Sequence, residues 1–267
     1  MPQLTVAAVQ TEPRFGEVAA NLAAALALVP PGCDLAVLPE LFATGYSFRS
    51  RDEVAALAEP VAPGDGAGPV LAALRAHAAA TGTTLVAGLA ERDGARLFNS
   101  AVLVRPDGSH GLYRKAHLFL DEKSLFDPGD LPFPVFAACG AVVGMMICFD
   151  WVFPEAARSL VLAGARVLAH PCNLVLPWCQ DAMVTRCLEN GVHAVTANRV
   201  GREDRAGTEL VFSGGSQVTG PRGERLARLG PAGAGAAVVR VDTEAPGPRL
   251  TRRNDVLGDR RPDLYRG

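Results

Sequence analysis

Short apolar runs alternate along the chain with longer segments whose apolar residues recur at helical spacing. Apolar runs that end at Gly, Pro or Asp-Gly are typical of buried strands, and apolar positions three and four apart are typical of helices. The pattern predicts helices over 17–29, 68–80, 154–163 and 180–190. It predicts strands over 4–10, 34–39, 83–91, 97–105, 111–115, 167–170, 192–198, 210–219, 224–229 and 236–241.

One uncharged segment, from Leu131 to Phe149, is long enough to raise the question of a membrane span. Prolines at 132 and 134 and glycines at 140 and 144 interrupt it, which a continuous helix would not tolerate well. We therefore predict two buried strands around a turn in this segment, and no membrane partner.

The alternation of strands and helices, with hairpins added, is typical of α/β layers built on a mixed sheet. The stretch 230–235, rich in Gly and Ala, is the most flexible, but the strand after it fits the same sheet. No convincing linker divides the chain. The prediction is a single domain over 1–267.

Composition and charge remove several classes of function. The formal charge of −2 over 267 residues gives no electrostatic reason to expect a nucleic acid or an anionic membrane surface as partner. The first ten residues have no basic region and no long apolar stretch, so they are expected to form a strand and not a secretory signal. The expected location is the cytoplasm.

Several cofactor motifs are absent. The first strand is not followed by Gly-x-Gly-x-x-Gly, no Walker-type phosphate loop occurs, and the glycine pair 214–215 lacks the nucleophile-elbow pattern of serine hydrolases. The six cysteines include no Cys-x-x-Cys pair and no His at zinc-ligand spacing, so we expect free thiols, no metal and no cofactor.

Three residues lie at the ends of predicted strands, where the active sites of α/β folds are usually found. Glu40 and Cys148 follow apolar strands, Lys115 ends another, and ligands of α/β sheets usually bind at the carboxyl ends of strands. Glu40 could take the thiol proton and then activate water, while Lys115 could hold its charge against an oxyanion. The cation and the helix that follows are expected to favour the Cys148 thiolate.

Each residue alone has an ordinary structural interpretation. Cys148 could be a core thiol, Glu40 a cap or an ion-pair partner, and Lys115 a surface lysine. Their separations along the chain fix no geometry. Spacing therefore does not decide between structure and catalysis.

The surrounding sequence does, because it resembles the nitrilase superfamily of carbon–nitrogen hydrolases, whose catalytic set is Glu, Lys and Cys in this order. The whole chain also looks close to small archaeal-type nitrilases and amidases. The resemblance covers nearly the whole chain. The matching segments are LPELFATGY (38–46), YRKAHLF (113–119), FDPG (126–129), CFDWVFPE (148–155), HPCN (170–173), RCLEN (186–190), NRVG (198–201), FSGGS (212–216) and RNDVLGDRRP (253–262).

The resemblance implies an α-β-β-α sandwich with mixed sheets, of the nitrilase-like kind that assembles into four layers, and a second catalytic glutamate, Glu122. It also implies a homodimer or larger homo-oligomer, paired through the helix after the nucleophile, with the tail 245–267 at the interface. Four further residues are expected to bind substrate: Tyr46, Phe149, Trp151 and Asn173.

The substrate is expected to be a small molecule. Relatives specialised for nitriles often carry Trp-Glu after the cysteine, whereas this chain has Phe149-Asp150, as in amidases and carbamoylases. We expect hydrolysis of a small aliphatic amide, with nitriles or N-carbamoyl compounds as alternatives, and a catalytically silent binding protein as the non-enzymatic alternative. Cys172 stands where the family more often has alanine, and it could narrow the pocket.

Overall fold

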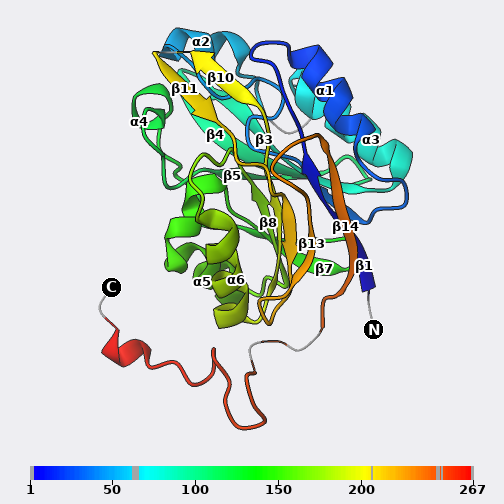
Figure 1. The fold of residues 1–267 in the computed structure, drawn as a ribbon, viewed down its shortest axis with the longest axis vertical. Coiled ribbons are helices and arrows are strands. Elements are labelled where there is room, and N and C mark those ends of the chain that lie inside the picture. Colours follow the sequence, from blue (N-terminus) through cyan, green and yellow to red (C-terminus); the bar gives the residue numbers. More distant parts are fainter. Residues whose placement is uncertain (1–2, 62–65, 206, 245–246, 248, 266–267) are drawn as a thin grey trace.

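The computed structural model describes residues 3–61, 66–205, 207–244, 247 and 249–265, and its centre is a pair of six-stranded sheets packed face to face (Figure 1). The first sheet has the order β14-β1-β2-β3-β4-β5 and the second β13-β12-β9-β8-β7-β6. In the first, the strands are β14 (Gly235–Asp242), β1 (Gln3–Gln10), β2 (Leu35–Val37), β3 (Thr84–Asp93), β4 (Arg96–Val104) and β5 (His110–Arg114). In the second they are β13 (Arg225–Arg228), β12 (Gln217–Thr219), β9 (His193–Ala197), β8 (Val167–Pro171), β7 (Ala141–Met145) and β6 (Val135–Ala138).

Both sheets are mixed. In each, the three central strands run parallel, namely β1-β2-β3 and β7-β8-β9, and antiparallel strands flank them. The carboxyl ends of β2 and β7 lead directly into Glu40 and Cys148. The predicted mixed α/β fold is confirmed.

Helices cover the outer face of each sheet (Figure 1). The first sheet carries α1 (Val18–Ala27) and α3 (Pro69–Thr81), and the second carries α5 (Pro154–Leu162) and α6 (Cys179–Asn190). Shorter elements lie in the connections: α2 (Arg51–Leu57), α4 (Glu122–Leu125), the 3₁₀ helices η1 (Cys148–Val152) and η2 (Pro262–Leu264), and the hairpin of β10 (Arg202–Arg205) and β11 (Thr208–Val211).

Strand β1 shows why the apolar runs are continuous. Val6 and Ala8 pack into the core between the two sheets, whereas Ala7 and Val9 pack under the helices of the first layer. Successive side chains of a strand point to opposite faces, so a strand that is covered on both faces needs apolar residues at every position.

The segment 131–149 forms β6 and β7 around a turn at Cys139 and Gly140, as predicted. The prediction that both strands are buried is wrong for β6, which is the edge strand of the second sheet and is only partly covered. Within the ranges that the structure describes, no helix is long and apolar enough to cross a membrane.

The predicted single strand over 210–219 is wrong. It is two strands, β11 and β12, separated by a bend in which Gly214 and Gly215 both have positive φ angles. That backbone conformation is readily available only to glycine, and it breaks the extended run.

The tail after β14 runs away from the two sheets (Figure 1). Of the expected interface segment 245–267, positions 245, 246, 248, 266 and 267 lie outside the described residues. Its place at an oligomer interface stays a prediction.

Candidate active site

Glu40 lies in the turn that follows β2, fully buried. Gly88 of β3 passes so close that a Cβ there would lie 2.4 Å from the Glu40 Cα, so only glycine fits. The next residue, Leu41, has a φ of 48°, a conformation that costs a non-glycine residue of order 1–3 kcal/mol. Tight packing and a strained backbone together fix where this carboxylate points.

Lys115 follows β5 and is also fully buried. Its backbone N–H donates to the Asn99 carbonyl at 2.8 Å, and its carbonyl accepts from Gly129 at 3.0 Å. Its Nζ donates to Glu40 Oε1 at 2.6 Å and to Glu122 at 2.8 Å. The ammonium therefore joins two carboxylates that are 82 residues apart in the chain.

Glu122 opens α4 and is 3% exposed. Its carboxylate accepts the Tyr46 hydroxyl at 2.6 Å and the Phe119 N–H at 3.1 Å, in addition to Lys115. The loop between Lys115 and Glu122 thus folds back and brings the two side chains together. A positive φ of 44° at Leu120 belongs to this return.

The charges of this cluster depend on one another. Burial disfavours the Lys115 ammonium, but Glu122 and Glu40 outweigh it and raise the pKa of Lys115 well above its usual range. Burial raises the pKa of Glu122, with the Lys115 charge opposing and the Glu40 charge adding to the rise. The pKa of Glu122 therefore lies above the usual value of a glutamate.

Glu40 keeps one oxygen uncommitted. Its Oε1 accepts from Lys115 and from Asn99 Nδ2 at 2.7 Å, whereas Oε2 has no hydrogen-bond partner among the described residues. Asn99 was missed by the sequence analysis, although a buried Asn within the apolar strand β4 is itself a signal. A buried carboxylate oxygen without a partner is suited to accept a proton.

Cys148 begins η1, directly after β7, with a φ of 39°. Its carbonyl lies 3.0 Å from His170 Nε2, and its Sγ lies 3.8 Å from the Asn173 carbonyl. His170 is buried, and burial lowers its pKa to about 4, so the ring is neutral and donates to the carbonyl through Nε2. This bond holds the backbone of the strained residue in place.

The expected lowering of the Cys148 pKa is wrong. A hydrogen bond with the Cys172 thiol and burial raise the pKa of Cys148 well above its usual range, and Lys115 only partly opposes them. The ammonium is already bound to two carboxylates, so its field at sulfur is weak. The resting residue is a thiol that needs a base.

Asp150 is a second polar residue that the sequence analysis did not assign. Its buried carboxylate accepts from the Ile147 N–H at 2.8 Å, the Tyr113 hydroxyl at 2.9 Å and His117 Nδ1 at 2.7 Å. It therefore ties the strand before the nucleophile to the strand that carries Lys115.

The four expected substrate-binding residues do not share one cavity. Phe149, Trp151 and Asn173 line a narrow recess with Cys148, closed by Phe119 and Leu174–Leu176. Its volume of about 10 Å³ is close to the space that one water needs. Asn173 also donates to the Glu40 carbonyl at 2.8 Å, so it joins the two halves of the site.

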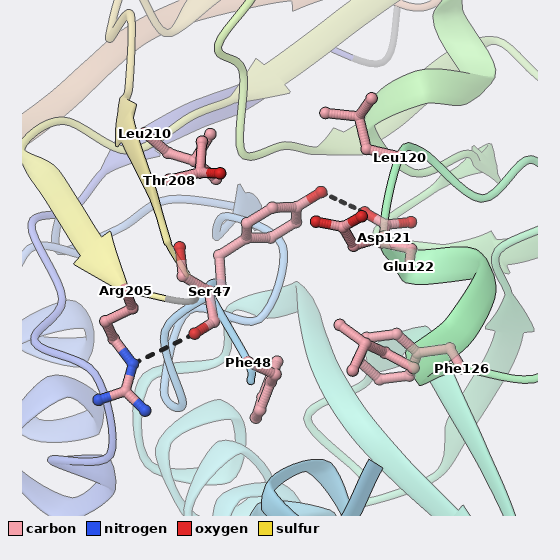
Figure 2. Close-up of a pocket in the computed structure, with 11 residues that line it drawn as sticks. Ser47, Phe48, Leu120, Asp121, Glu122, Phe126, Arg205, Thr208 and Leu210 are labelled. Atoms are coloured by element: carbon pink, nitrogen blue, oxygen red, sulfur yellow. Dashed lines mark hydrogen bonds between the residues drawn. The ribbon is translucent and has the colours of Figure 1, made fainter. Parts of the chain in front are cut away.

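Tyr46 lies instead in a neighbouring cavity of about 270 Å³. Figure 2 shows Glu122 reaching into this cavity opposite Thr208 and Leu210 of β11, with the Arg205 side chain donating to the Ser47 carbonyl at 3.2 Å. Glu122 therefore lines this cavity, while its carboxylate is bonded to Tyr46 and Lys115.

One group of side chains could hold a soft cation. His170, Cys172 and Cys179 are buried and bring one nitrogen and two sulfurs within 4.8 Å of one another. Histidine and thiolate are ligands that zinc or copper accepts. The expectation that the protein works without a metal remains a prediction.

Comparison with known proteins agrees with this geometry. Residues 5–247 match the carbon-nitrogen hydrolase family. A nitrilase of Pyrococcus abyssi is 44% identical over 265 residues, covering 97% of this chain and 98% of the relative. An N-carbamoylputrescine amidase of Solanum lycopersicum is 32% identical, covering 98% and 94%.

The fold also matches solved structures. A variant of the amidase from Nesterenkonia sp. AN1, a protein of the nitrilase superfamily, superposes with a TM-score of 0.79 at 29% identity and covers 98% of both chains. In that structure acrylamide is added at the active-site cysteine. These likenesses favour an enzyme over a silent binding protein.

Proposed function

Because this chain belongs to the carbon–nitrogen hydrolase family, the nitrilase superfamily, we propose that it hydrolyses a small aliphatic amide through a thioester on Cys148 and releases ammonia. The observation that carries the proposal is the buried ion-paired cluster of Glu40, Lys115 and Glu122. Asn173 links this cluster to the nucleophile, because its amide donates to the Glu40 carbonyl at 2.8 Å and its own carbonyl lies 3.8 Å from Cys148 Sγ.

The first half of the reaction forms the thioester. The uncommitted oxygen of Glu40 takes the Cys148 proton, and the sulfur attacks the amide carbon. The oxyanion that develops is stabilised by the third N–H of the Lys115 ammonium and by a backbone N–H after the nucleophile. Glu40 returns the proton to the nitrogen, which leaves as ammonia.

The second half releases the acid. Glu40 deprotonates a water, the resulting hydroxide attacks the thioester carbon, and the thiol is restored with that proton. Glu122 positions the water and the substrate through its bonds to Lys115 and Tyr46. Glu40 thus acts as the base in both halves of the reaction, which agrees with its one carboxylate oxygen that has no hydrogen-bond partner among the described residues.

The recess at Cys148 supports a short, uncharged acyl group. It is lined by Phe119, Phe149, Trp151 and the apolar side chains of 174–176. Its small volume in the free enzyme leaves room only for a compact group unless these side chains move. Tyr46 acts through Glu122 and faces the adjoining cavity, where the more distant part of a substrate would lie.

Nitriles and N-carbamoyl amines or amino acids are the alternatives, since relatives named for both chemistries align along nearly the whole chain. The catalytic groups do not separate them, because nitrile and amide hydrolysis share the thioester. Ammonia release from a matched panel of short amides, nitriles and carbamoyl compounds tests the choice. Highest kcat/KM on a nitrile or a carbamoyl compound overturns the amide assignment.

Cys148→Ala tests the mechanism. We expect ammonia release to fall to background with an unchanged unfolding midpoint, because Ala keeps the core volume nearly filled. Cys33→Ala and Cys139→Ala are the controls, expected to change stability alone. Turnover by Cys148→Ala within tenfold of the parent contradicts the mechanism.

We also propose that the protein acts as a homodimer or larger homo-oligomer of one-domain chains in the cytoplasm. The covering helices of the second sheet expose Leu162 and Leu188, and Trp178, the residue before α6, is 61% exposed. Large apolar side chains exposed on this covering layer are candidates for an interface between copies of the chain. Light scattering after gel filtration tests this, with a monomer of 27.9 kDa as the contrary result.

A further inference from the structure

Beside the nucleophile lies a group of thiols that amide hydrolysis does not use. Cys172 and Cys179 are both fully buried, and both belong to the same core cluster as Cys148. The sulfurs of Cys172 and Cys179 lie within 4.8 Å of each other, and the Cys172 thiol is also near enough to the Cys148 thiol to raise its pKa. Cys172 therefore stands between the nucleophile and a third sulfur.

Contacts of His170 locate Cys172 independently. The Nε2 atom of His170 lies 3.0 Å from the Cys148 carbonyl oxygen and 3.2 Å from Cys172 Sγ. On the other side, Cys148 Sγ lies 3.8 Å from the carbonyl of Asn173, the residue after Cys172. The His170 ring contacts both cysteines, and the peptide that follows Cys172 contacts the Cys148 sulfur.

The other thiols have different surroundings. Cys187 Sγ lies against the Thr219 carbonyl at 3.9 Å, and Cys33 Sγ against the Leu35 carbonyl at 3.1 Å. Neither is a neighbour of Cys148. The position of Cys172 commonly carries alanine in the family that the chain resembles, so this second thiol is not needed for the shared chemistry.

We propose that Cys172 is a resolving thiol, which forms a reversible disulfide with Cys148 when a hydroperoxide enters the active site. Because it takes Cys148 as the reactive residue, this inference rests on the proposed function. It assigns to the buried sulfur pair a modification that protects the nucleophile from irreversible oxidation.

The chemistry balances in two steps. The Cys148 sulfur, after Glu40 has taken its proton, attacks the distal oxygen of the hydroperoxide. The O–O bond breaks, Cys148 becomes a sulfenic acid, and the alcohol or water leaves with the proton from Glu40. Cys172 then attacks the Cys148 sulfur, the S–O bond breaks, and hydroxide leaves as water with the Cys172 proton.

Position gives the second step its advantage. Cys148 lines a narrow recess and the Cys172 thiol beside it is fully buried, so a sulfenic acid on Cys148 and the Cys172 thiol react as an intramolecular pair. A second peroxide must first enter that recess to make the sulfinic acid, which is irreversible. The disulfide therefore forms first.

The test treats the full-length reduced protein with hydrogen peroxide and records intact mass, a peptide disulfide map and ammonia release, before and after dithiothreitol. We expect the parent to lose two hydrogen atoms in mass, to show a Cys148–Cys172 bond, and to regain its activity with dithiothreitol. Cys172→Ala is expected to gain two or three oxygen atoms on Cys148 and to stay inactive. Cys172→Ser serves if the alanine variant fails to fold, and Cys179→Ala is the matched control that behaves as the parent.

A bond mapped to Cys172–Cys179, or equal and irreversible inactivation of the parent and Cys172→Ala, overturns the proposal. The mass readout needs no turnover, so it is separate from the proposed function. If Cys148→Ala retains turnover, the proposed function fails, whereas the disulfide map still decides whether Cys172 resolves oxidised Cys148.

Discussion

Two consecutive residues at the end of β5 lie in two charged clusters with opposite characters. Arg114 binds Glu91, Asp93 and Asp130 at 2.5, 2.8 and 3.1 Å, and its guanidinium lies 3.9 Å above the Phe98 ring. Burial opposes its charge, but these carboxylates outweigh it and raise the pKa of Arg114 further. Each nitrogen of the Arg114 guanidinium therefore has a carboxylate partner.

The next residue, Lys115, lies in a cluster that is more deeply buried and less complete. Its side chain and that of Glu40 are fully buried, yet Glu40 Oε2 has no partner among the described residues. Leaving a buried acceptor unsatisfied costs about 1–3 kcal/mol. The contrast shows two uses of buried charge. The fully partnered Arg114 cluster stabilises the fold, whereas the unpartnered Oε2 of Glu40 is where a proton can be accepted.

The largest expected effect is on Glu40. Glu40→Gln removes the base from both halves of the reaction, and a positioned base is worth about 10²–10⁴-fold. We expect kcat/KM to fall by about 10⁴-fold, with little acyl-enzyme in the mass spectrum after mixing with amide. Glu91→Gln, in the Arg114 cluster, is the matched control and is expected to keep turnover per folded molecule. Acylation of Glu40→Gln at the parent rate would show that Glu40 is not the base.

Arg114→Met tests the fully partnered cluster, which is expected to contribute to stability and not to catalysis. It leaves Glu91 buried without its cation, and breaking a buried pair costs about 3–5 kcal/mol. We expect the midpoint of urea unfolding to fall accordingly, with kcat unchanged in the protein that remains folded. Arg96→Met is the control, because Arg96 pairs with Asp130 near solvent and such pairs are worth about 0–1 kcal/mol. Equal losses of stability in both variants would contradict the assigned role of Arg114.

Lys115→Met removes the cation from the unsaturated cluster. Loss of one oxyanion donor typically costs about 10²–10³ in kcat. The chain offers a close control, since its only other lysine, Lys123, is exposed eight residues later. Steady-state assays are expected to show the loss for Lys115→Met and none for Lys123→Met. A larger fall in kcat for Lys123→Met than for Lys115→Met would contradict the assignment of the buried lysine as the oxyanion donor.

The sequence predicted most of the scaffold because strands buried on both faces leave long apolar runs. It failed where that signal is absent. The hairpin of β10 and β11 starts with the wholly polar Arg202–Arg205, and α4 is a four-residue helix with no periodicity. Such elements are set by tertiary contacts, such as the buried ion pair between Arg199 and Glu203 of β10.

For the site, the family resemblance named Glu40, Lys115, Glu122 and Cys148, and the structure brings the three charged residues into contact. What the sequence could not provide is the thiol pKa, because it depends on Cys172, Lys115 and Glu40 meeting in space. The scarcity of lysine was a further signal for Lys115 that the sequence interpretation did not use, because only two of the 26 Lys and Arg residues are lysine.

Glu122→Gln is expected to have the smallest effect on chemistry and the most informative one on mechanism. Glutamine keeps the shape of the side chain, and its one oxygen can still accept from the Tyr46 hydroxyl, whereas its NH₂ group replaces the oxygen that accepts the Phe119 N–H. It cannot offer Lys115 a charge, so the ammonium binds Glu40 more tightly and the water of the second half is less well placed. Because Glu40 remains free to take the thiol proton, acylation should continue while deacylation slows. We therefore expect a covalent adduct on Cys148 to accumulate in the mass spectrum of Glu122→Gln mixed with a good amide substrate. Asp121→Asn, which changes an exposed carboxylate beside the same cavity, should show no adduct. If Glu122→Gln accumulates no more adduct than Glu40→Gln, the two glutamates act in the same step, and the distinction between base and positioning residue is wrong.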